Sequence, residues 1–447
     1  MKKTITLLLA LTACLPLFSQ SEKNDNKEEN IKSGWNIGGV PAITFSTDLG
    51  FQYGVVLNLF DYGDGSNYPS YDQMFYFEVS RFTKGSGIYR IMFDSESLIP
   101  GISLTSDLAY LTDQAYDFYG FNGYDAVYNK DWTDSELDGS VYKTRMFYNT
   151  DRTLFRFKND FKGHLAGDHF QWNAGFEIKN FTFGPVDVER LNKGKDDNLL
   201  PDVDGLYSKY IDWGLIGPEE ADGGFITTLK AGITYDSRDF KANAMKGIWV
   251  ETGIEGSPSF LSDEGFAKFF AIYRQYFTII PEDLSFAYRL GYQTTIAGDV
   301  PWYHQNQIIT SVLAGTTSEG LGGSKNLRGV LRNRIIGDGL FYANAEFRWK
   351  AIRFNLINQN FYLGLVGFGD FGMVTDKIDF EIPDQATMGS DQEEDYFNPG
   401  AEKMHISTGL GLRVVMNQNF IISADFGKAL NEQDGNIGFY IGLNYLF

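Results

Sequence analysis

Two charged residues, far apart in the chain, have the types and settings of a buried ion pair. Arg328 follows a glycine-rich stretch from Gly320 to Leu327, and Asp370 stands in the middle of an apolar segment. Each residue is costly to bury without a partner. An arginine and a carboxylate can form two parallel hydrogen bonds, so such a pair would make a geometrically specific latch. The plainer alternative is that Arg328 is a solvated loop residue.

Some motifs typical of enzymes occur, but their spacing or the predicted structure around them does not match what the enzymes require. Gly367 to Gly372 has the spacing G-x-G-x-x-G, yet the extended pattern continues through Met373-Val374, where a dinucleotide site needs a helix. The stretch from Gly320 to Lys325 lacks the spacing of a P-loop, and the chain has no G-x-S-x-G nucleophile elbow. We therefore expect no catalytic residues, no cofactor and no enzymatic activity.

Candidate metal ligands are equally poorly spaced. His164 and His169 are five residues apart near a predicted turn, which fits no helical zinc pair, and the four histidines are expected at surfaces or interfaces. The acidic runs at 196–204 and 391–395 do not follow the spacing of an EF-hand loop. Both runs are interpreted as solvated loops, and no metal site is predicted.

The composition limits the classes of protein further. The 447 residues include 38 basic and 58 acidic ones, which gives a formal net charge of −20. A nucleic-acid backbone needs a basic surface, so nucleic acid is excluded as a partner. Aromatic residues reach 16% and there are 49 glycines, a mixture that favours strands and turns over helices. No apolar stretch of about 18 residues follows the N-terminus, which excludes a bundle of membrane helices.

The first residues have the pattern of a secretory signal peptide, predicted over 1–19. Two lysines precede a short apolar core from Ile5 to Leu11, and Ser19 offers a small residue for cleavage. Alternatively Cys14, the only cysteine, is the lipidated residue of a lipobox. Residues 20–33 are almost entirely polar and are interpreted as a disordered periplasmic linker.

From Gly34 onward the hydrophobic pattern has a period of two. The segment from Phe341 to Lys350 alternates between apolar residues and polar or charged ones, and similar segments surround Ala231, Tyr288 and Leu412. Successive strand side chains point to opposite faces, so these strands have one apolar face and one polar or ionic face. A soluble β-sandwich would alternate in the same way.

Three features favour a membrane barrel over a sandwich. The alternating segments are about ten residues long, as a tilted membrane strand requires. A secretory signal occurs without a disulfide framework. The chain also finishes on an apolar strand that ends with Tyr445 and Phe447, whereas soluble termini tend to fray. The sequence therefore predicts an all-β fold, a transmembrane antiparallel β-barrel over residues 34–447, in contact with the lipid of the bacterial outer membrane.

We expect sixteen strands, joined by short turns on the periplasmic side and long loops on the extracellular side. Lys84 to Gly87, Pro281 to Asp283 and Met416 to Asn419 are interpreted as periplasmic turns. The predicted extracellular segments are 113–142, 186–224, 303–340 and 377–404. The predicted strand centres are Val55, Tyr76, Ile91, Ser106, Phe155, Ala174, Ala231, Thr252, Ile272, Leu290, Ile309, Ala345, Leu365, Leu410, Ala424 and Ile441.

Five short motifs occur in the order typical of one barrel family. They are Phe118-Tyr119-Gly120 (F-Y-G); Tyr235, Asp236, Arg238 and Asp239 followed by Gly247 (Y-D-x-R-D…x-G); Leu327-Arg328-Gly329 (V-R-G); Glu346 and Arg348 (E-x-R); and Gly367 to Gly372, with Phe368, Asp370 and Gly372 (G-F-x-D-x-G). Together they resemble the outer-membrane assembly and translocation superfamily, the BamA/TamA-type or bacterial surface antigen barrels.

This resemblance implies a sixteen-stranded barrel with an extracellular loop folded into its lumen, where Arg328 pairs with Asp370. Gly329, Glu346 and Arg348 would complete this lumen latch. The terminal Phe447, with Tyr445, resembles a C-terminal assembly signal and is expected at the lipid interface. Family members usually carry POTRA domains, which this chain is expected to lack.

The leading functional hypothesis is an accessory role in outer-membrane protein assembly or export. The partners would be client proteins or an assembly complex, and the working device would be a weak seam between the first and last strands. Gly438 and Gly442 lie in the last strand, and glycine weakens strand pairing. A passive channel gated by the lumen loop and a surface adhesin or scaffold are the alternatives.

Overall fold

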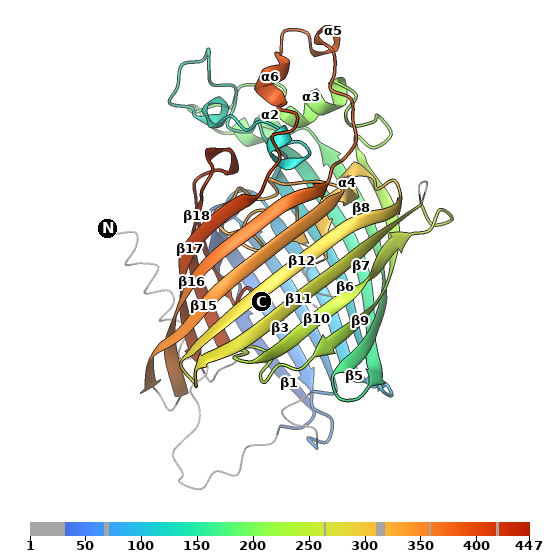
Figure 1. The fold of residues 1–447 in the computed structure, drawn as a ribbon, viewed down its shortest axis with the longest axis vertical. Coiled ribbons are helices and arrows are strands. Elements are labelled where there is room, and N and C mark those ends of the chain that lie inside the picture. The colour runs from blue at the N-terminus through green and yellow to red at the C-terminus, as the bar shows by residue number, and fades with distance from the viewer. Residues whose placement is uncertain (1–31, 67–70, 263–264, 310–317, 357–358, 417–419) are drawn as a thin grey trace.

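The computed structural model describes residues 32–66, 71–262, 265–309, 318–356, 359–416 and 420–447. The predicted signal peptide and most of the predicted linker lie outside these residues. The described chain forms one closed antiparallel β-barrel, with long loops at one end and short turns at the other (Figure 1). No helix among the described residues is long and apolar enough to cross a membrane.

The barrel has sixteen strands, because β1 and β2 both pair with β3 and form one interrupted first strand. All neighbouring strands are antiparallel and follow the chain order around the barrel. The strands are β1 (Trp35–Pro41), β2 (Thr44–Ser46), β3 (Gly50–Asp61), β4 (Gln73–Phe82), β5 (Gly87–Ile99), β6 (Ile102–Asp117), β7 (Asn149–Ala166), β8 (Phe170–Gly184), β9 (Gly223–Asp236), β10 (Gly247–Ser257), β11 (Phe266–Ile280), β12 (Leu284–Gly298), β15 (Gly339–Leu356), β16 (Gln359–Asp376), β17 (His405–Met416), β18 (Phe420–Ala429) and β19 (Ile437–Leu443).

The alternation along each strand separates a lipid face from a lumen face. In β15, Phe347 and Trp349 are 55% and 49% exposed on the outside, whereas Glu346 and Arg348 are buried inside. This is the pattern that a barrel needs in lipid, with apolar side chains outside and paired charges inside. The predicted fold class is thereby confirmed.

Short helices occur only in the connections at the long-loop end of the described chain. Aromatic residues from four of these connections pack together, and we call this cluster the aromatic cap: Phe118, Tyr207, Tyr210, Trp213, Trp302 and Tyr396 are among its members. The helical segments are η2 (Gly123–Asp125), η3 (Lys130–Thr133), α2 (Val188–Asn192), α3 (Leu206–Asp212), α4 (Trp302–Gln305), α5 (Gln385–Met388), α6 (Glu393–Tyr396) and η4 (Glu432–Asp434).

Three sequence predictions about the elements are wrong. The strand expected near Ile309 is not a barrel strand: β13 (Gln307–Ile308) pairs only with β14 (Ser318–Glu319), in a separate sheet. The first barrel strand, β1 with β2, was missed. The turn at Lys84 to Gly87 lies at the long-loop end, since the Ser86 hydroxyl donates to Asp113 of β6, next to the first long loop.

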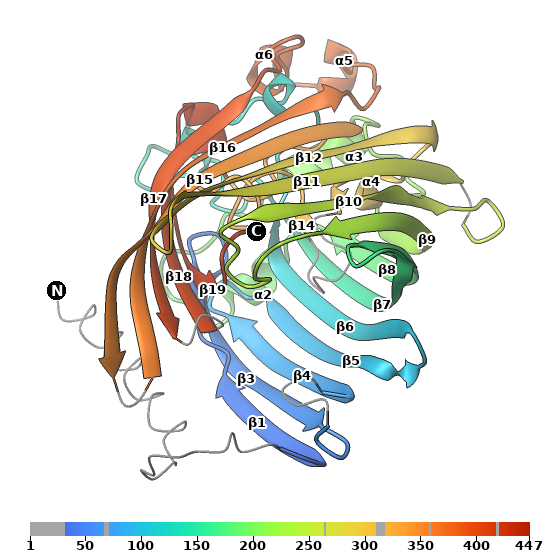
Figure 2. The ribbon, with the colours of Figure 1, turned by 60° about the horizontal axis from the view of Figure 1, so that its bottom comes forward.

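The barrel closes between β2 and β19, and this strand seam is short. Among the described residues, the strand pairing across it covers two pairs, Tyr440 with Ser46 and Ile441 with Phe45, and Thr47 adds hydrogen bonds to Phe439. Among the described residues, β1 pairs with β3 on one side and with no strand on the other. The chain after β19 turns inward, and the C-terminus lies inside the ring of strands when the barrel is viewed from its short-turn end (Figure 2).

Candidate functional site in the barrel lumen

A segment of the β12–β15 connection, residues 318–336, lies inside the barrel, and we call it the lumen loop. The Asn326 side chain fixes its turn, because its Oδ1 accepts hydrogen bonds from the backbone N–H groups of Gly322 and Leu327 at 2.6 and 2.8 Å. Leu321 and Leu327 are fully buried and pack over Gly372 of β16. A side chain at Gly372 would meet Leu327 at 2.9 Å, so glycine there permits the close approach.

Arg328 reaches from the lumen loop to Asp370 of β16. Its Nε and Nη2 donate to the two oxygens of the Asp370 carboxylate at 2.9 and 3.0 Å. The backbone N–H of Arg328 donates to the same carboxylate at 3.0 Å, and both side chains are buried. The guanidinium lies 3.5 Å from the ring centroid of Phe368. Three hydrogen bonds and a stacked ring therefore fix the position of one arginine.

Further charges from β15 and β18 complete the surroundings of Arg328. Its Nη1 lies 2.7 Å from Glu346 and 3.7 Å from Asp425. Arg348 donates from Nε to the other oxygen of Glu346 at 2.8 Å. Each buried charge thus has an opposite charge beside it, which offsets the cost of burial.

The tip of the lumen loop also touches the last two strands. Gly329 has φ +97°, and a side chain there would meet the backbone of Gly427 in β18 at 2.5 Å. The backbone N–H of Gly329 donates to the Tyr440 hydroxyl of β19 at 3.2 Å. The loop tip therefore lies directly beside the strand seam.

A model of the Omp85 superfamily domain matches residues 124–447 of this chain. The chain belongs to the Omp85 superfamily. It is an integral outer-membrane β-barrel, as the resemblance drawn from the sequence predicted. No curated protein sequence matches the chain.

Two solved structures resemble this Omp85 barrel in fold. One is BamA from Haemophilus ducreyi lacking POTRA domains 1-3, with a TM-score of 0.55 and 12% identity over 93% of this chain and 71% of that chain. The other is CdiB from Escherichia coli, with a TM-score of 0.53 and 10% identity over 92% of this chain. The present chain spans 62% of the length of that CdiB chain. At such low identity these likenesses show the fold alone.

The Y-D-x-R-D motif of the Omp85 barrel forms its β9–β10 turn at the short-turn end. Arg238 binds the Asp236 carboxylate through Nε and Nη2 at 2.9 and 2.7 Å. The Asp239 carboxylate accepts backbone N–H groups across the turn, including that of Met245 at 3.0 Å, and Gly247 begins β10. Tyr235 points outward, 4.8 Å from Phe170. The motif therefore stabilises a turn and takes no part in the lumen latch.

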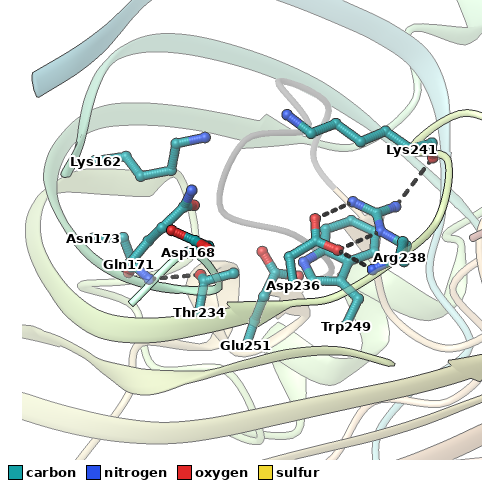
Figure 3. A pocket seen from close by; sticks show the side chains of 10 residues that line it. All are labelled: Lys162, Asp168, Gln171, Asn173, Thr234, Asp236, Arg238, Lys241, Trp249 and Glu251. Carbon is teal, nitrogen blue, oxygen red and sulfur yellow. Dashed lines mark hydrogen bonds and ion pairs between the residues drawn. The ribbon is translucent and has the colours of Figure 1, made fainter. Parts of the chain in front are cut away.

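Beside this turn the inner wall holds a polar cavity of about 260 Å³ (Figure 3). Trp249 stacks between the guanidinium groups of Arg238 and Arg274, at 3.8 and 3.7 Å. These arginines pair with Asp236 and Glu251, both of which line the cavity. The charges of Asp236, Arg238 and Glu251 are thus compensated within the wall.

The C-terminal aromatic residues lie in the lumen of the Omp85 barrel. Arg348 donates to the Phe447 carbonyl at 2.8 Å, and its guanidinium lies 4.8 Å from the Phe447 ring centroid. Tyr445 packs against Tyr362 in a buried cluster. The prediction that Phe447 lies at the lipid interface is therefore wrong, because the chain bends inward after β19. Its role as an assembly signal stays a prediction.

Sequence reasoning missed two further arginines of the lumen loop. Arg332 binds Asp113 and Asp117 of β6, and Arg334 donates to the backbone carbonyls of Gly123, Ala126 and Gln433 in neighbouring loops. The available signal was the run Leu327-Arg328-Gly329-Val330-Leu331-Arg332-Asn333-Arg334, with three arginines close together. The motif comparison singled out only the first.

Two histidines also differ from the expectation of surface sites. His405 is buried and contacts Asp434 at 2.6 Å and Glu402 at 3.2 Å, while His304 is buried 3.2 Å from Glu255. The described residues contain no group of three or more His, Cys, Asp or Glu side chains placed to hold a metal ion.

Proposed function

We propose that this Omp85 barrel acts in the insertion or export of proteins at the outer membrane, as an accessory subunit docked to partner proteins. The single observation that carries the proposal is the strand seam, where only two residue pairs join β2 to β19. Neighbouring strands elsewhere are paired over far longer stretches, such as Leu284 to Thr294 of β12 with β15. The seam is the place where this barrel opens at the lowest cost.

The edge of β1 beside the seam supports a role in strand pairing. Its apolar residues Trp35 and Ile37 are exposed on the outer face, and its second edge has no partner strand in the described chain. Unpaired backbone groups are costly in lipid, so this edge favours the addition of another strand. A client strand of alternating pattern has the chemistry to satisfy it.

Gly438 and Gly442 support the proposal from the opposite side of the seam. Both lie within the seven residues of β19. Glycine in a strand adds no packing and costs conformational entropy, so these positions lower the stability of the last strand. The weak closure is thus a property of both seam strands.

Locking the seam tests this function directly. Phe45 and Ile441 lie opposite each other across it, so Phe45→Cys with Ile441→Cys can form a disulfide. Val55→Cys with Val79→Cys is the matched control, because these residues face each other in β3 and β4 on the outer surface. We measure the folded outer-membrane and exported proteins in cells that depend on the barrel.

We expect the oxidised seam pair to lose activity and to regain it on reduction, while the control pair stays active throughout. Full activity with a quantitatively oxidised seam would contradict the proposal. Purification in mild detergent should also recover client or complex proteins with the barrel. Recovery of the barrel alone would count against the accessory role.

A further inference from the structure

Arg332 anchors the lumen loop to the wall opposite the Arg328 contacts. Its Nε donates to Asp117 at 2.5 Å, its Nη1 donates to Asp113 at 2.8 Å, and its Nη2 donates to the Ala115 carbonyl at 3.3 Å. All three acceptors belong to β6. Asn333 adds a hydrogen bond from its Nδ2 to the Asp117 carbonyl at 2.7 Å.

The two anchors lie on opposite sides of the seam. Around the barrel the strand order is β16, β17, β18, β19, β2, β3, β4, β5 and β6. Arg328 holds β16, and the loop tip touches β18 and β19, which precede the seam. Arg332 holds β6, which follows it. The lumen loop therefore crosses behind the seam and ties its two sides together.

Hydrogen bonds continue from the Arg332 anchor to the seam itself. Asp113, which binds Arg332, also accepts the Ser86 hydroxyl at 2.9 Å. In the same turn, Lys84 donates from Nζ to the Thr47 carbonyl at 2.7 Å. Thr47 in turn binds Phe439 of β19, with its backbone N–H donating to the Phe439 carbonyl at 3.0 Å. A chain of hydrogen bonds through one turn therefore links the Arg332 anchor to the seam.

We propose that Arg332 is a positioning residue that holds the seam closed from inside the barrel. Arg328 and Arg332 are the two arms of one brace, and loss of the Arg332 arm frees the β2–β3 hairpin while the Arg328 arm still holds the loop on β16. Arg332 would thus restrain the opening of the seam. Only the purpose of that opening, the insertion or export of proteins, rests on the proposed function.

The chemistry of the site makes Arg332 difficult to replace. Its guanidinium serves two carboxylates and a carbonyl at once, which the rigid fork of arginine permits and a lysine ammonium does not. In Arg332→Gln, Asp113 and Asp117 lose the cation that pairs with both of them, so the loop loses the two ion pairs that hold it on β6. In Arg332→Lys the charge remains but the three-way geometry is lost.

The test measures the seam itself, with the Phe45→Cys and Ile441→Cys pair as the reporter in intact outer membranes. The rate of disulfide formation is compared in the parent, in Arg332→Gln and in Arg332→Lys. Arg145→Gln is the matched control, because Arg145 is an exposed arginine whose guanidinium donates to the Asn198 carbonyl and has no ion pair within the described residues. We expect a fall of about tenfold for Gln, a smaller fall for Lys and none for the control.

The Val55→Cys and Val79→Cys pair, placed in the same variants, reports on folding. An unchanged seam rate in folded Arg332→Gln would overturn the inference. If disulfide formation in the control pair also slows in Arg332→Gln, that variant is misfolded. The seam rate of folded Arg332→Lys then tests the inference, and an unchanged rate there would overturn it. If the seam disulfide forms more slowly in Arg332→Gln and the parent barrel has no assembly or export activity, this inference is upheld and the proposed function is rejected. The two failures are therefore distinguishable.

Discussion

At the residue scale, the Arg328–Asp370 pair should behave as one unit. Removal of either partner leaves a buried charge unpaired, which costs about 3–5 kcal/mol for a fully buried pair and less where lumen water reaches it. We expect Arg328→Ala and Asp370→Ala to lower the unfolding temperature of the purified barrel alike, and the double variant to be no worse than either single one. Additive losses in this double-mutant cycle would contradict a shared role.

Asp48, in the hairpin between β2 and β3, should make stability depend on pH. Burial and the nearby Asp117 raise its pKa from 3.8 to about 7, against the opposing effect of Arg332 and Lys84. The folded barrel therefore holds this proton more tightly than the unfolded chain, so its contribution is present at low pH and lost as the pH rises from about 4 to about 7.

We expect the wild-type unfolding temperature to fall between pH 5 and pH 8 by more than that of Asp48→Asn, as measured by heat-dependent gel mobility. Equal changes in the two proteins would show that Asp48 does not cause the dependence.

Sequence predicted some site residues and not others, for a physical reason. Arg328 and Asp370 were found mostly because the V-R-G and G-F-x-D-x-G motifs resemble those of the barrel family. The cost of burying either charge without a partner supported the pairing. Arg332 was not found, because its partners Asp113 and Asp117 stand at the polar end of β6. There the sequence pattern is the same whether a carboxylate is exposed to solvent or pairs with an arginine. Only the folded loop places them together.

At the element scale, the misplaced strand and the missed strand have related causes. Ile308 and the lumen-loop residues Leu321, Leu327 and Val330 are buried in one cluster. A loop that is buried inside a barrel needs apolar residues, so its sequence imitates a strand. The first strand was missed because it is broken near Pro41 and has little alternation around Gly38 and Gly39. The hydrophobic pattern of the sequence indicates which residues are buried, and in this barrel both the strands and the lumen loop contain buried apolar residues.

The contact between the loop tip and β18 gives a test at this scale. A side chain at Gly427 would lie 2.4 Å from the Arg328 carbonyl, whereas one at Gly367 of β16 meets nothing within 4 Å. We expect Gly427→Ala to destabilise the barrel by about 1–3 kcal/mol through overpacking. Gly367→Ala, the matched control, should have little effect. Equal unfolding temperatures for the two variants would show that the tip is not tightly seated.

At the scale of the whole molecule, the placement of the loops sets the orientation in the membrane. Asp134 and Ser390 are exposed residues of two long connections at the capped end. Long loops lie outside the cell in outer-membrane barrels, while the opposite turns are short and periplasmic. Epitope tags inserted at these positions should be labelled on intact cells. Labelling only after permeabilisation would reverse the topology.

The lumen loop and the aromatic cap predict a barrel that conducts poorly. Rings from distant connections meet across the capped end, as Trp302 does with Phe118 and Tyr207. We expect wild-type protein in planar bilayers to show little steady conductance, and a variant without residues 120–146 to show more. A large stable conductance in the wild type would favour the passive channel over the proposed role.

The aromatic cap has a consequence for the cell as a permeability barrier. Aromatic rings close the long-loop end of the barrel, while a polar cavity lies in its wall near the short-turn end. With the long loops outside the cell, as predicted, we expect solutes to reach the interior from the periplasmic side. We therefore expect a cell to hold many copies without admitting bulky antibiotics, and an inhibitor aimed at the lumen would have to cross the outer membrane by another route.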